Sequence, residues 1–393
     1  MAFPTMNSNE FYNTIFNAYK LVTTLADQLS GLDDSLANEF RTDGGMYHDT
    51  LVYTDMDVLM SRVFDPDDTN VLAPEMVVAP KQQTVVIDKM RQIGLYTDNL
   101  LSKRAWMNEN AFDQFESVVQ AQVRNTKRVY DQRLVDCFVG TTETTVGKQT
   151  VSIDVTTAVG DTTGEEKNRL EAQTLAKGIA GIFTQLKDST RDYNDNEFLK
   201  AIDKSKMKII WNADMYEKIL YTDLPTIFHK DNLLESGKVL PARYFGTPTS
   251  AVPSGADGTT HRAYMEEYKI RVGSNGEYSA EGTIIKNVFP GDLLPKGTPI
   301  VAVSTAETTG SGSFTINGKK NTITYYSTVH AYVADSTIVC KIYHENGVKF
   351  PSSFETSTEF WNPKNLRTNR YLTWIYANPF YLKGYPFITV KEA

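Results

Sequence analysis

The side chains that most often carry catalysis or bind metals are scattered in this sequence of 393 residues. Histidine occurs five times, and no two histidines are closer than fourteen positions. None has a carboxylate or a second histidine at the spacing of a metal site such as H-E-x-x-H. We therefore expect surface or structural roles for all five, which are His48, His229, His261, His330 and His344.

One glycine-containing segment has some of the residues of a phosphate-binding loop. Six residues separate Gly140 from Gly147-Lys148, where a P-loop has four. Gln149 follows at the position where Ser or Thr would hold magnesium. The segment fails on both spacing and residue type, so we predict no nucleotide site there.

An acidic turn, DPDDTN, begins at Asp65 and has some of the residues of a calcium loop. Such a loop needs glycine at its sixth position and glutamate at its twelfth, and this sequence has Asn70 and Met76 there. We interpret the segment as an acidic β-turn. Two cysteines, Cys137 and Cys340, have no zinc-type spacing and are predicted to be buried free thiols in a reducing compartment.

The common catalytic motifs G-x-S-x-G, G-x-G-x-x-G and C-x-x-C do not occur in the sequence. The acidic pairs Glu165-Glu166 and Glu266-Glu267 are predicted to be solvated ends of a helix and a strand. The sequence therefore predicts that the protein is not an enzyme. It also predicts no catalytic, cofactor-binding or metal-binding residues and no cofactor.

The composition is that of a globular chain with a core. Apolar residues make up 41% and charged residues 22%, and the formal charge is −8. No stretch approaches the roughly 18 apolar residues of a membrane span, and the start lacks the features of a signal peptide. The acidic balance argues against a dedicated DNA-binding protein. It is compatible with a protein that encloses a polyanion without adhering to it.

The N-terminal segment and the one that follows it differ in pattern. Apolar residues between Phe11 and Leu25 recur with a helical period, which predicts an amphipathic helix. From Leu51 to about Tyr96 the pattern predicts a long two-stranded ribbon around the acidic turn. An isolated ribbon is marginally stable and its open edges invite pairing, so we expect it to lie against something outside its own domain.

The strongest predicted element is a long helix. Residues 95–139 contain neither Gly nor Pro, and an apolar stripe runs along them. We expect about 30 helical residues spanning roughly 45 Å. Asn108 is predicted to cap the start and Gly140 to end the helix. Arg124, Lys127, Arg128 and Arg133 lie on it and are predicted to contact nucleic acid, a neighbouring subunit or solvent.

The rest of the chain alternates helices with strands. The Thr-rich segment after Gly140 predicts a β-hairpin or an exposed loop. A second helix is expected at about 165–188, and a short buried strand at 206–212 feeds a helix capped by Asn212. Residues 281–350 are β-dominated, with a hairpin signal at Asn317-Gly318. The aromatic C-terminus predicts a packed sheet face in preference to a surface that stacks sugars or bases.

This order of segments resembles the Hong Kong 97 capsid fold. The segment TRDYNDNEFLKAIDKSKMKIIWNADMYEKI, at 190–219, is similar to a segment of major capsid proteins from short-tailed, podovirus-like phages. The resemblance implies an α+β fold with an N-arm, an E-loop ribbon, a spine helix in the P domain, an A domain and closing P-domain strands. The implied limits are 1–47 for the N-arm, 48–104 for the E-loop, 105–189 for the P domain with its spine helix, 190–354 for the A domain with a β-rich insertion at about 281–350, and 355–393 for the closing strands.

The resemblance implies a structural protein that assembles as hexamers and pentamers into the icosahedral head enclosing double-stranded DNA. Its partners would be other capsid subunits, with non-specific contact to DNA and no membrane, and scaffolding, portal and decoration proteins are further candidates. It would be made in the host bacterial cytoplasm and located in the virion. Two alternatives stay open, an encapsulin-like shell that encloses cargo proteins and a carbohydrate-active enzyme or binding module.

The predicted functional residues are those that the ribbon would offer to a neighbouring subunit. They are Val58, Leu59, Val63, Val77, Val78 and Lys81. Some members of the resembled family cross-link subunits through Lys and Asn. No local motif pairs Lys81 with Asn369 or Asn378, so we expect no cross-link here.

Overall fold

The computed structural model describes residues 35–59, 61, 79–98, 109–144, 146–221, 237–248, 261–264, 268–272, 283–293, 310–316, 319–325, 331–364 and 367–393. The helix predicted around residues 11–25 and the acidic turn at 65–70 lie outside these ranges. Helices and strands both occur throughout the described part, as predicted for an α+β protein. The chain divides into two compact units, and each is described by itself.

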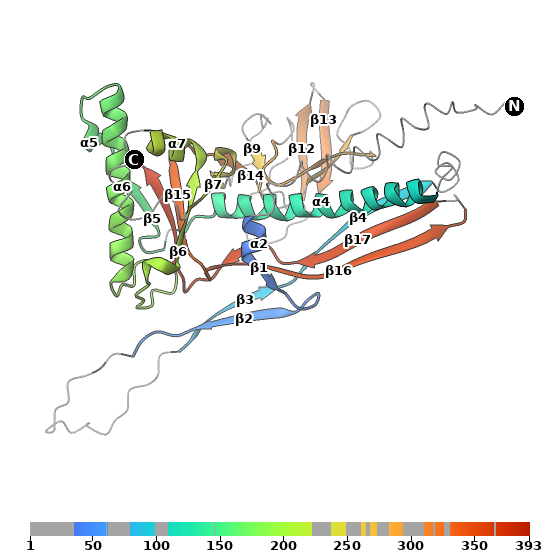
Figure 1. Cartoon of the computed structure of the whole chain (residues 1–393), viewed down its shortest axis with the longest axis horizontal. Coiled ribbons are helices and arrows are strands. Elements are labelled where there is room, and N and C mark those ends of the chain that lie inside the picture. Colours follow the sequence, from blue (N-terminus) through green and yellow to red (C-terminus); the bar gives the residue numbers. More distant parts are fainter. Residues whose placement is uncertain are drawn as a thin grey trace, which may run out of the picture. The chain divides into compact units, whose positions relative to one another are not determined.

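The first unit comprises residues 1–51, 86–135 and 350–378. Its sheet has the order β1-β16-β17-β4, in which β1 runs parallel to β16 and the other neighbours are antiparallel. Figure 1 shows β16 and β17 as a long hairpin with β4 along one side. The strands are β1 (Arg41–Asp43), β4 (Lys89–Asp98), β16 (Val348–Asn362) and β17 (Arg367–Tyr376), and a short helix, α2 (Leu36–Phe40), precedes β1.

The predicted long helix is confirmed as α4 (Glu109–Thr141), with 33 residues. Within the first unit its Tyr130 makes edge-to-face contacts with Trp374 and Tyr376 of β17. The two tyrosine hydroxyls lie 3.0 Å apart. Trp374 and Tyr376 are 2% and 1% exposed, so these aromatic residues of the C-terminus form a packed sheet face, as predicted.

Two ion pairs connect α4 to strands of the first unit. Arg41 of β1 lies 3.0 Å from Asp131, and Lys127 lies 2.6 Å from Glu355 of β16. Asp131 is almost fully buried. Burial raises its pKa to about 6, although Lys127 and Arg41 act in the opposite direction.

We expect Asp131 to make stability depend on pH in a definite window. Because its pKa is higher in the folded state, the folded protein binds more protons between about pH 4 and pH 6. Ionising the buried Asp131 carboxyl group costs on the order of 3 kcal/mol. The folded protein does not bear this cost below the window, where the group is protonated, and bears it in full above the window. The free energy of unfolding of the wild type, measured relative to that of Asp131→Asn, should therefore fall by an amount of this order as the pH rises from 4 to 6. Urea unfolding of the unassembled subunit across the window measures it, and a constant difference between the two proteins would contradict the assignment.

The second unit comprises residues 52–85, 136–349 and 379–393. Its main sheet has the order β5-β19-β15-β6-β7. The central strand β15 pairs antiparallel with both neighbours, whereas the outer pairs β5–β19 and β6–β7 are parallel. The strands are β5 (Thr150–Ile153), β6 (Met207–Asn212), β7 (Gly237–Leu240), β15 (Ile338–His344) and β19 (Phe387–Glu392).

Helices of the second unit cover this sheet (Figure 1). The predicted second helix is confirmed as α6 (Glu165–Lys187), which buries Leu175, Ile179 and Leu186 in the core. The predicted strand and helix at 206–221 are confirmed as β6 and α7 (Ala213–Tyr221). Asn212 lies at their junction, where its side chain accepts a hydrogen bond from the Asp214 amide at 3.4 Å.

The Thr-rich segment after Gly140 was predicted to form a β-hairpin or an exposed loop, and this prediction was wrong. The segment forms the edge strand β5 and a short helix, α5 (Thr156–Val159). β5 pairs in parallel with the C-terminal strand β19, with Thr150 opposite Thr389. A local pattern of threonines and glycines carries no information about a partner more than 200 residues away, so the sequence could not distinguish this strand from a hairpin.

The β-dominated range 281–350 contains two kinds of strand. β11 (Thr283–Val288) pairs with β10 (Tyr268–Val272), and β12 (Gly310–Ile316) pairs with β13 (Lys319–Tyr325). The latter pair confirms the predicted hairpin. By contrast, β14 (Ala331–Ala334) joins β8 (Gly246–Pro248) and β9 (His261–Ala263), and β15 is the central strand of the main sheet.

Gly140 does not end the long helix, which continues to Thr141. A Cβ at Gly140 would lie 2.1 Å from the carbonyl oxygen of Tyr244 in the short helix η3 (Ala242–Tyr244). The glycine therefore permits a close approach of two backbones. Lys341 of β15 lies beside the helix end, where its buried ammonium donates to the Thr142 carbonyl at 2.9 Å. Burial lowers the pKa of Lys341 to about 7.

Candidate subunit interface

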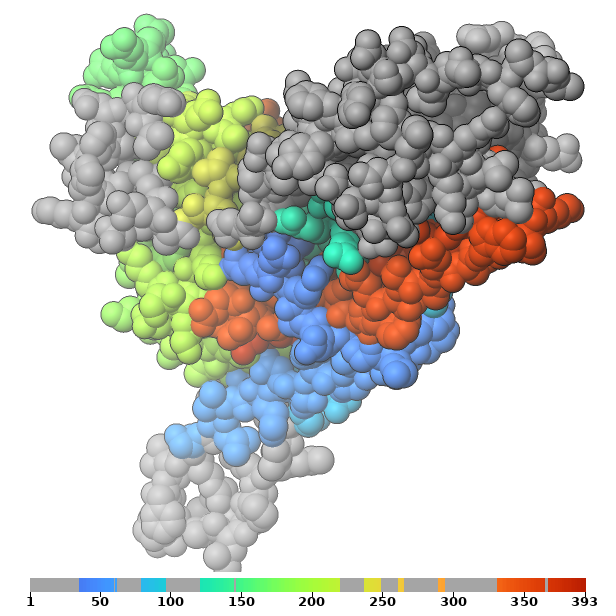
Figure 2. Space-filling model, turned by 45° about the vertical axis from the view of Figure 1, so that its right-hand side comes forward, coloured from blue at the N-terminus to red at the C-terminus, as the bar shows by residue number. Residues whose placement is uncertain are grey.

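The predicted two-stranded ribbon is present and forms a sheet of its own. It consists of β2 (Thr50–Asp55) and β3 (Lys81–Val86). Exposed and half-buried residues alternate along both strands, so one face is covered and the other is open. We use "the ribbon" for residues 52–59 and 79–85, all of which belong to the second unit. Its blue residues lie at the surface in Figure 2.

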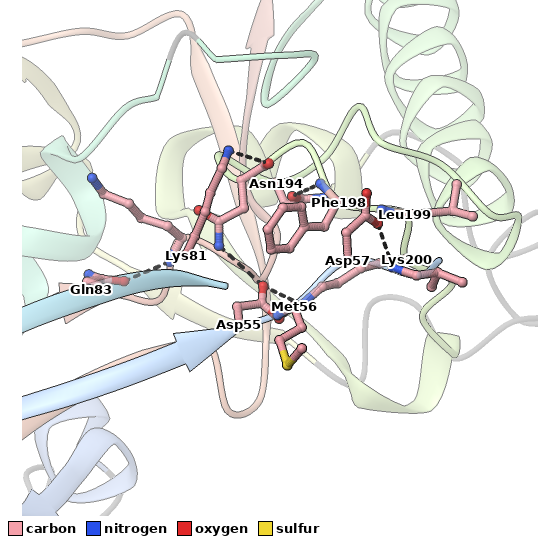
Figure 3. Close-up of polar contacts among 12 residues, drawn as sticks. Asp55, Met56, Asp57, Lys81, Gln83, Asn194, Phe198, Leu199 and Lys200 are labelled. Atoms are coloured by element: carbon pink, nitrogen blue, oxygen red, sulfur yellow. Dashed lines mark hydrogen bonds and ion pairs between the residues drawn. The ribbon is translucent and has the colours of Figure 1, made fainter. Parts of the chain in front are cut away.

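A carboxylate at the end of β2 fixes the ribbon to its own subunit. The two oxygens of Asp55 lie 2.9 and 2.8 Å from the Lys200 ammonium, and one of them accepts a hydrogen bond from Asn196 at 3.2 Å. Figure 3 shows Asp55 and Lys200 converging at this point. The Lys200 ammonium also lies 5.1 Å from the centre of the Tyr385 ring. This half-buried pair is more specific than a solvated one because it has an amide and a ring as additional partners.

A second carboxylate, two residues further on, continues the attachment. One oxygen of Asp57 lies 2.5 Å from Arg191, and the other accepts hydrogen bonds from the amides of Leu199 and Val58 at 2.9 and 2.8 Å. The Leu199 amide and the Arg191 guanidinium together hold the pKa of Asp57 below its ordinary value. This attachment contributes stability above pH 4 and is lost as the pH falls through the lowered pKa.

The returning strand β3 is attached through two side chains. Lys81 donates to the carbonyl of Asn196 at 2.7 Å, and its ammonium lies 5.2 Å from the Phe198 ring centre. Gln83 donates to the carbonyl of Tyr381 at 3.0 Å and accepts from the amide of Lys383 at the same distance. The side-chain amide of Gln83 therefore bonds to the backbone as a neighbouring strand would.

The loop that receives the ribbon is ordered by its own contacts. Asn194 donates to the Phe198 carbonyl at 2.8 Å and accepts from the Phe198 amide at 2.9 Å. The carboxylate of Asp195 accepts hydrogen bonds from Thr144 at 2.9 Å and from Tyr381 at 2.6 Å. This loop is the TRDYNDNEF segment on which the sequence resemblance rested. In this chain the segment contains the docking surface for the ribbon.

A pocket of about 210 Å³ lies beside the ribbon. Its lining includes one carboxylate, Asp55, which is already paired with Lys200. A glycosidase needs two carboxyl groups across a cleft, roughly 5–9.5 Å apart. The lining of this pocket does not supply that pair.

Gly384 is predicted to be essential for the attachment of the ribbon. A Cβ at this position would lie 1.9 Å from an Asp55 oxygen, so Gly384→Ala should displace the carboxylate from Lys200. We expect amide hydrogen exchange at residues 52–55 and 83–85 to become at least tenfold faster, with little change in the main sheet. Gln82→Ala, which truncates an exposed side chain of the same ribbon, is the control. Unchanged exchange in Gly384→Ala would show that the attachment does not depend on this carboxylate.

The open side of the ribbon carries several apolar residues beside polar ones such as Thr54 and Thr84. Val52, Met56, Val58 and Leu59 are 52%, 57%, 59% and 60% exposed. Contiguous exposed apolar residues on a soluble chain mark interaction surfaces. The ribbon therefore binds its own subunit through polar side chains, and it exposes Val52, Met56, Val58 and Leu59, which we call its apolar face, in the isolated chain.

The six residues predicted for the interface fall into three groups. Val58 and Leu59 are exposed on the apolar side of the ribbon. Lys81 contacts the chain's own loop at Asn196. Val63, Val77 and Val78 lie outside the described residues. Their role in contacts between subunits stays a prediction. Sequence reasoning missed Asp55, Asp57 and Gln83, which form the attachment.

The residues that had some features of a chemical site have structural partners. Lys148 of the phosphate-loop-like segment lies 2.7 Å from Asp192, and Gly147 adopts a φ of 63° against the Asp192 backbone. Both cysteines are buried and free, as predicted. Across the described ranges, no group of three or more His, Cys, Asp or Glu could hold a metal ion, and no helix is long and apolar enough to cross a membrane.

Comparison with solved structures identifies the fold. A chain in the capsid structure of Staphylococcus phage Andhra matches with a TM-score of 0.54 and 9% identity, over 90% of this chain and 83% of that chain. A chain in the structure of the head fiber and inner core protein gp22 of native bacteriophage P68 matches with a TM-score of 0.56 and 8% identity, over 91% and 84%. No protein-family model matches the sequence, and a search of curated proteins found no match.

These similarities confirm an α+β fold of the kind found in phage capsids. The likeness extends over about nine tenths of the chain. The finer assignment to the Hong Kong 97 fold stays a prediction.

Proposed function

We propose that this protein is the major capsid protein of a short-tailed bacteriophage. The observation that carries the proposal is the fold, which is similar to that of a phage capsid chain over nearly the whole length. The exposed apolar side of the ribbon supports it, because an isolated subunit leaves this surface in water. In this proposal the protein is structural and has no enzymatic activity.

The proposed mechanism is assembly through repeated contacts between copies of one chain. Head-to-tail contacts are heterologous, and they form a closed ring when the rotation between neighbouring subunits is a whole fraction of a full turn. Five-fold and six-fold rotations would give pentamers and hexamers. The apolar side of each ribbon would lie on the next subunit, and a standard contact of this kind buries about 1,600 Å². Because each subunit makes several such contacts, the shell needs no covalent bond.

The shell would enclose double-stranded DNA, and the protein would pass from the host bacterial cytoplasm into the virion. Scaffolding, portal and decoration proteins are proposed as its transient or peripheral partners. The five segments from N-arm to closing strands, with the limits given above, are the proposed domain organisation.

Electron microscopy of the purified full chain tests the proposal. We expect closed icosahedral particles that contain hexamers and pentamers. A protein that stays monomeric under all assembly conditions, and with its scaffolding protein supplied, would overturn the proposal. Particles isolated from the native source should contain DNA, whereas enzyme cargo would identify a bacterial compartment shell.

A further inference from the structure

A buried histidine lies close to the attachment of the ribbon. His344, the last residue of β15, is 5% exposed. Its ring stacks on that of Tyr385, with 4.5 Å between the ring centres and 27° between the planes. Its Nδ1 accepts a hydrogen bond from the Asn346 amide at 3.1 Å. Because Nδ1 is the acceptor in the neutral ring, a second proton can enter only there, and it would break this hydrogen bond.

We propose that protonation of His344 releases the ribbon from its own subunit, so that the attachment is closed near neutral pH and opens in mildly acidic solution. Two series of contacts connect the imidazole to the ribbon. One consists of backbone hydrogen bonds and the other passes through the Tyr385 ring. The inference concerns the free subunit and does not depend on the assembly function proposed above.

The backbone connection starts at the turn between β15 and β16. This turn is also closed by the Gly347 amide, which donates to the His344 carbonyl at 2.7 Å. The Gly347 carbonyl in turn accepts from the Leu382 amide at 2.7 Å. The next residue is Lys383, whose amide donates to Gln83 of β3 at 3.0 Å. Loss of the Nδ1 hydrogen bond therefore loosens the turn that positions the backbone to which Gln83 binds.

The second connection passes through an aromatic ring. The Lys200 ammonium lies 5.1 Å from the centre of the Tyr385 ring, and it pairs with Asp55 of β2 at 2.8 Å. An imidazolium stacked on the same ring would compete with Lys200 for the π electrons and would repel the ammonium. Protonation of His344 therefore also weakens the position of the cation that holds Asp55.

The charges around His344 favour its neutral form. Burial lowers the pKa of His344 below its ordinary value of about 6.5. Glu345 acts in the opposite direction, and three nearby ammonium groups add to the effect of burial, those of Lys200, Lys206 and Lys349. When the turn and Tyr385 move away, the imidazole regains water and its pKa rises toward the ordinary value.

The sign of the pH dependence follows from this difference in pKa. The open form of the attachment binds the proton more tightly than the closed form does, so protons shift the equilibrium toward the open form. The closed attachment therefore has its full stability above about pH 6.5 and loses stability as the pH falls through the lowered pKa of His344.

Hydrogen exchange of the unassembled full chain between about pH 5 and pH 7.5 tests the proposal. Protection factors are corrected for the intrinsic effect of pH on exchange. We expect those of ribbon amides at 52–55 and 83–85 to fall at least about threefold from pH 7 to pH 5, whereas amides of α6 keep their protection. The range lies above the lowered pKa of Asp57, so titration of that carboxylate does not contribute.

Two variants and one further measurement make the test specific. His344→Asn cannot become charged and keeps an acceptor for the turn amide, so its ribbon should be equally protected at pH 5 and pH 7. His261→Asn, on β9, is the control and should respond as the wild type does. In NMR spectra of the wild type, the ribbon amide shifts should titrate with the midpoint of the His344 imidazole.

Three results would overturn the proposal. They are constant ribbon protection in the wild type, an equal fall in His344→Asn, and ribbon amide shifts whose midpoint differs from that of His344. Particle formation is scored separately by electron microscopy, so the two proposals can fail independently.

Discussion

Gly140→Ala is expected to destabilise the second unit by about 3 kcal/mol or more, and to lower the yield of soluble protein accordingly. The methyl group would lie 2.1 Å from the Tyr244 carbonyl oxygen and 2.6 Å from its carbon. Both are backbone atoms of a nearly buried residue, so no side-chain rotation relieves the overlap. Either the end of α4 or the turn at η3 must move, and the tyrosines packed around Cys137 move with it. Thermal and urea unfolding of the free subunit measure the loss.

Gly181→Ala is the matched control for this effect. Gly181 also lies inside a long helix, α6, but a Cβ there meets nothing within 4 Å. Alanine in an open helical position should stabilise the protein by about 0.5–1 kcal/mol. If both substitutions changed the free energy of unfolding in the same direction, the close approach of the two backbones would not be the reason why position 140 needs glycine.

The long elements of the fold could be predicted because their signals are local. α4 was predicted from an uninterrupted stretch with an apolar stripe, and α6 from the same periodicity. The β6–α7 junction could be predicted because a buried strand followed by Asn212 has few other interpretations. In each case the periodicity within one segment was sufficient.

The sheet partners could not be predicted, because they join distant parts of the chain. β5 pairs with β19, and β15 takes the centre of the main sheet between β19 and β6. β15 is buried at all seven positions, including Lys341. A lysine in an otherwise apolar run is easily taken for a mark of exposure, although here it caps the end of α4.

The ribbon could be predicted as an element, but its attachment could not. Asp55 and Asp57 are ordinary residues in a segment with several aspartates, and only the fold brings them to Arg191 and Lys200. One signal was available. The segment at 190–199 is rich in polar residues with defined hydrogen-bonding geometry, such as Asn194, and such a segment usually orders a loop for binding.

In the proposed assembly, the two faces of the ribbon have different roles. The ion pairs at Asp55 and Asp57 hold the ribbon at a defined place before any neighbour is present. Fixing the ribbon in advance lowers the conformational entropy lost on contact. In the proposed assembly the apolar face would then supply the binding energy. The polar contacts would fix the orientation of the ribbon and the apolar face would set the affinity between subunits, so substitutions on the two faces should have different consequences.

Introducing charge on the apolar face is the substitution with the largest expected effect on assembly. Val58→Asp/Leu59→Asp places two carboxylates on residues that are 59% and 60% exposed in the free chain. The subunit itself should lose no more than about 0.5 kcal/mol of stability, because exposed positions tolerate such changes. In a contact between subunits each carboxylate would be desolvated without a partner, which costs about 1–3 kcal/mol or more. The cost recurs at every ribbon in the shell, so we expect particle yield to fall by at least about a hundredfold.

Sedimentation and negative-stain microscopy of matched preparations measure this yield. Val239→Asp is the control, because Val239 is 43% exposed and lies on the edge strand β7, outside the ribbon and the loop that receives it. That variant should assemble normally. If Val58→Asp/Leu59→Asp also forms particles in normal yield, the apolar face of the ribbon does not lie between subunits. The ribbon would then be an appendage of its own subunit, held there by Asp55, Asp57, Lys81 and Gln83.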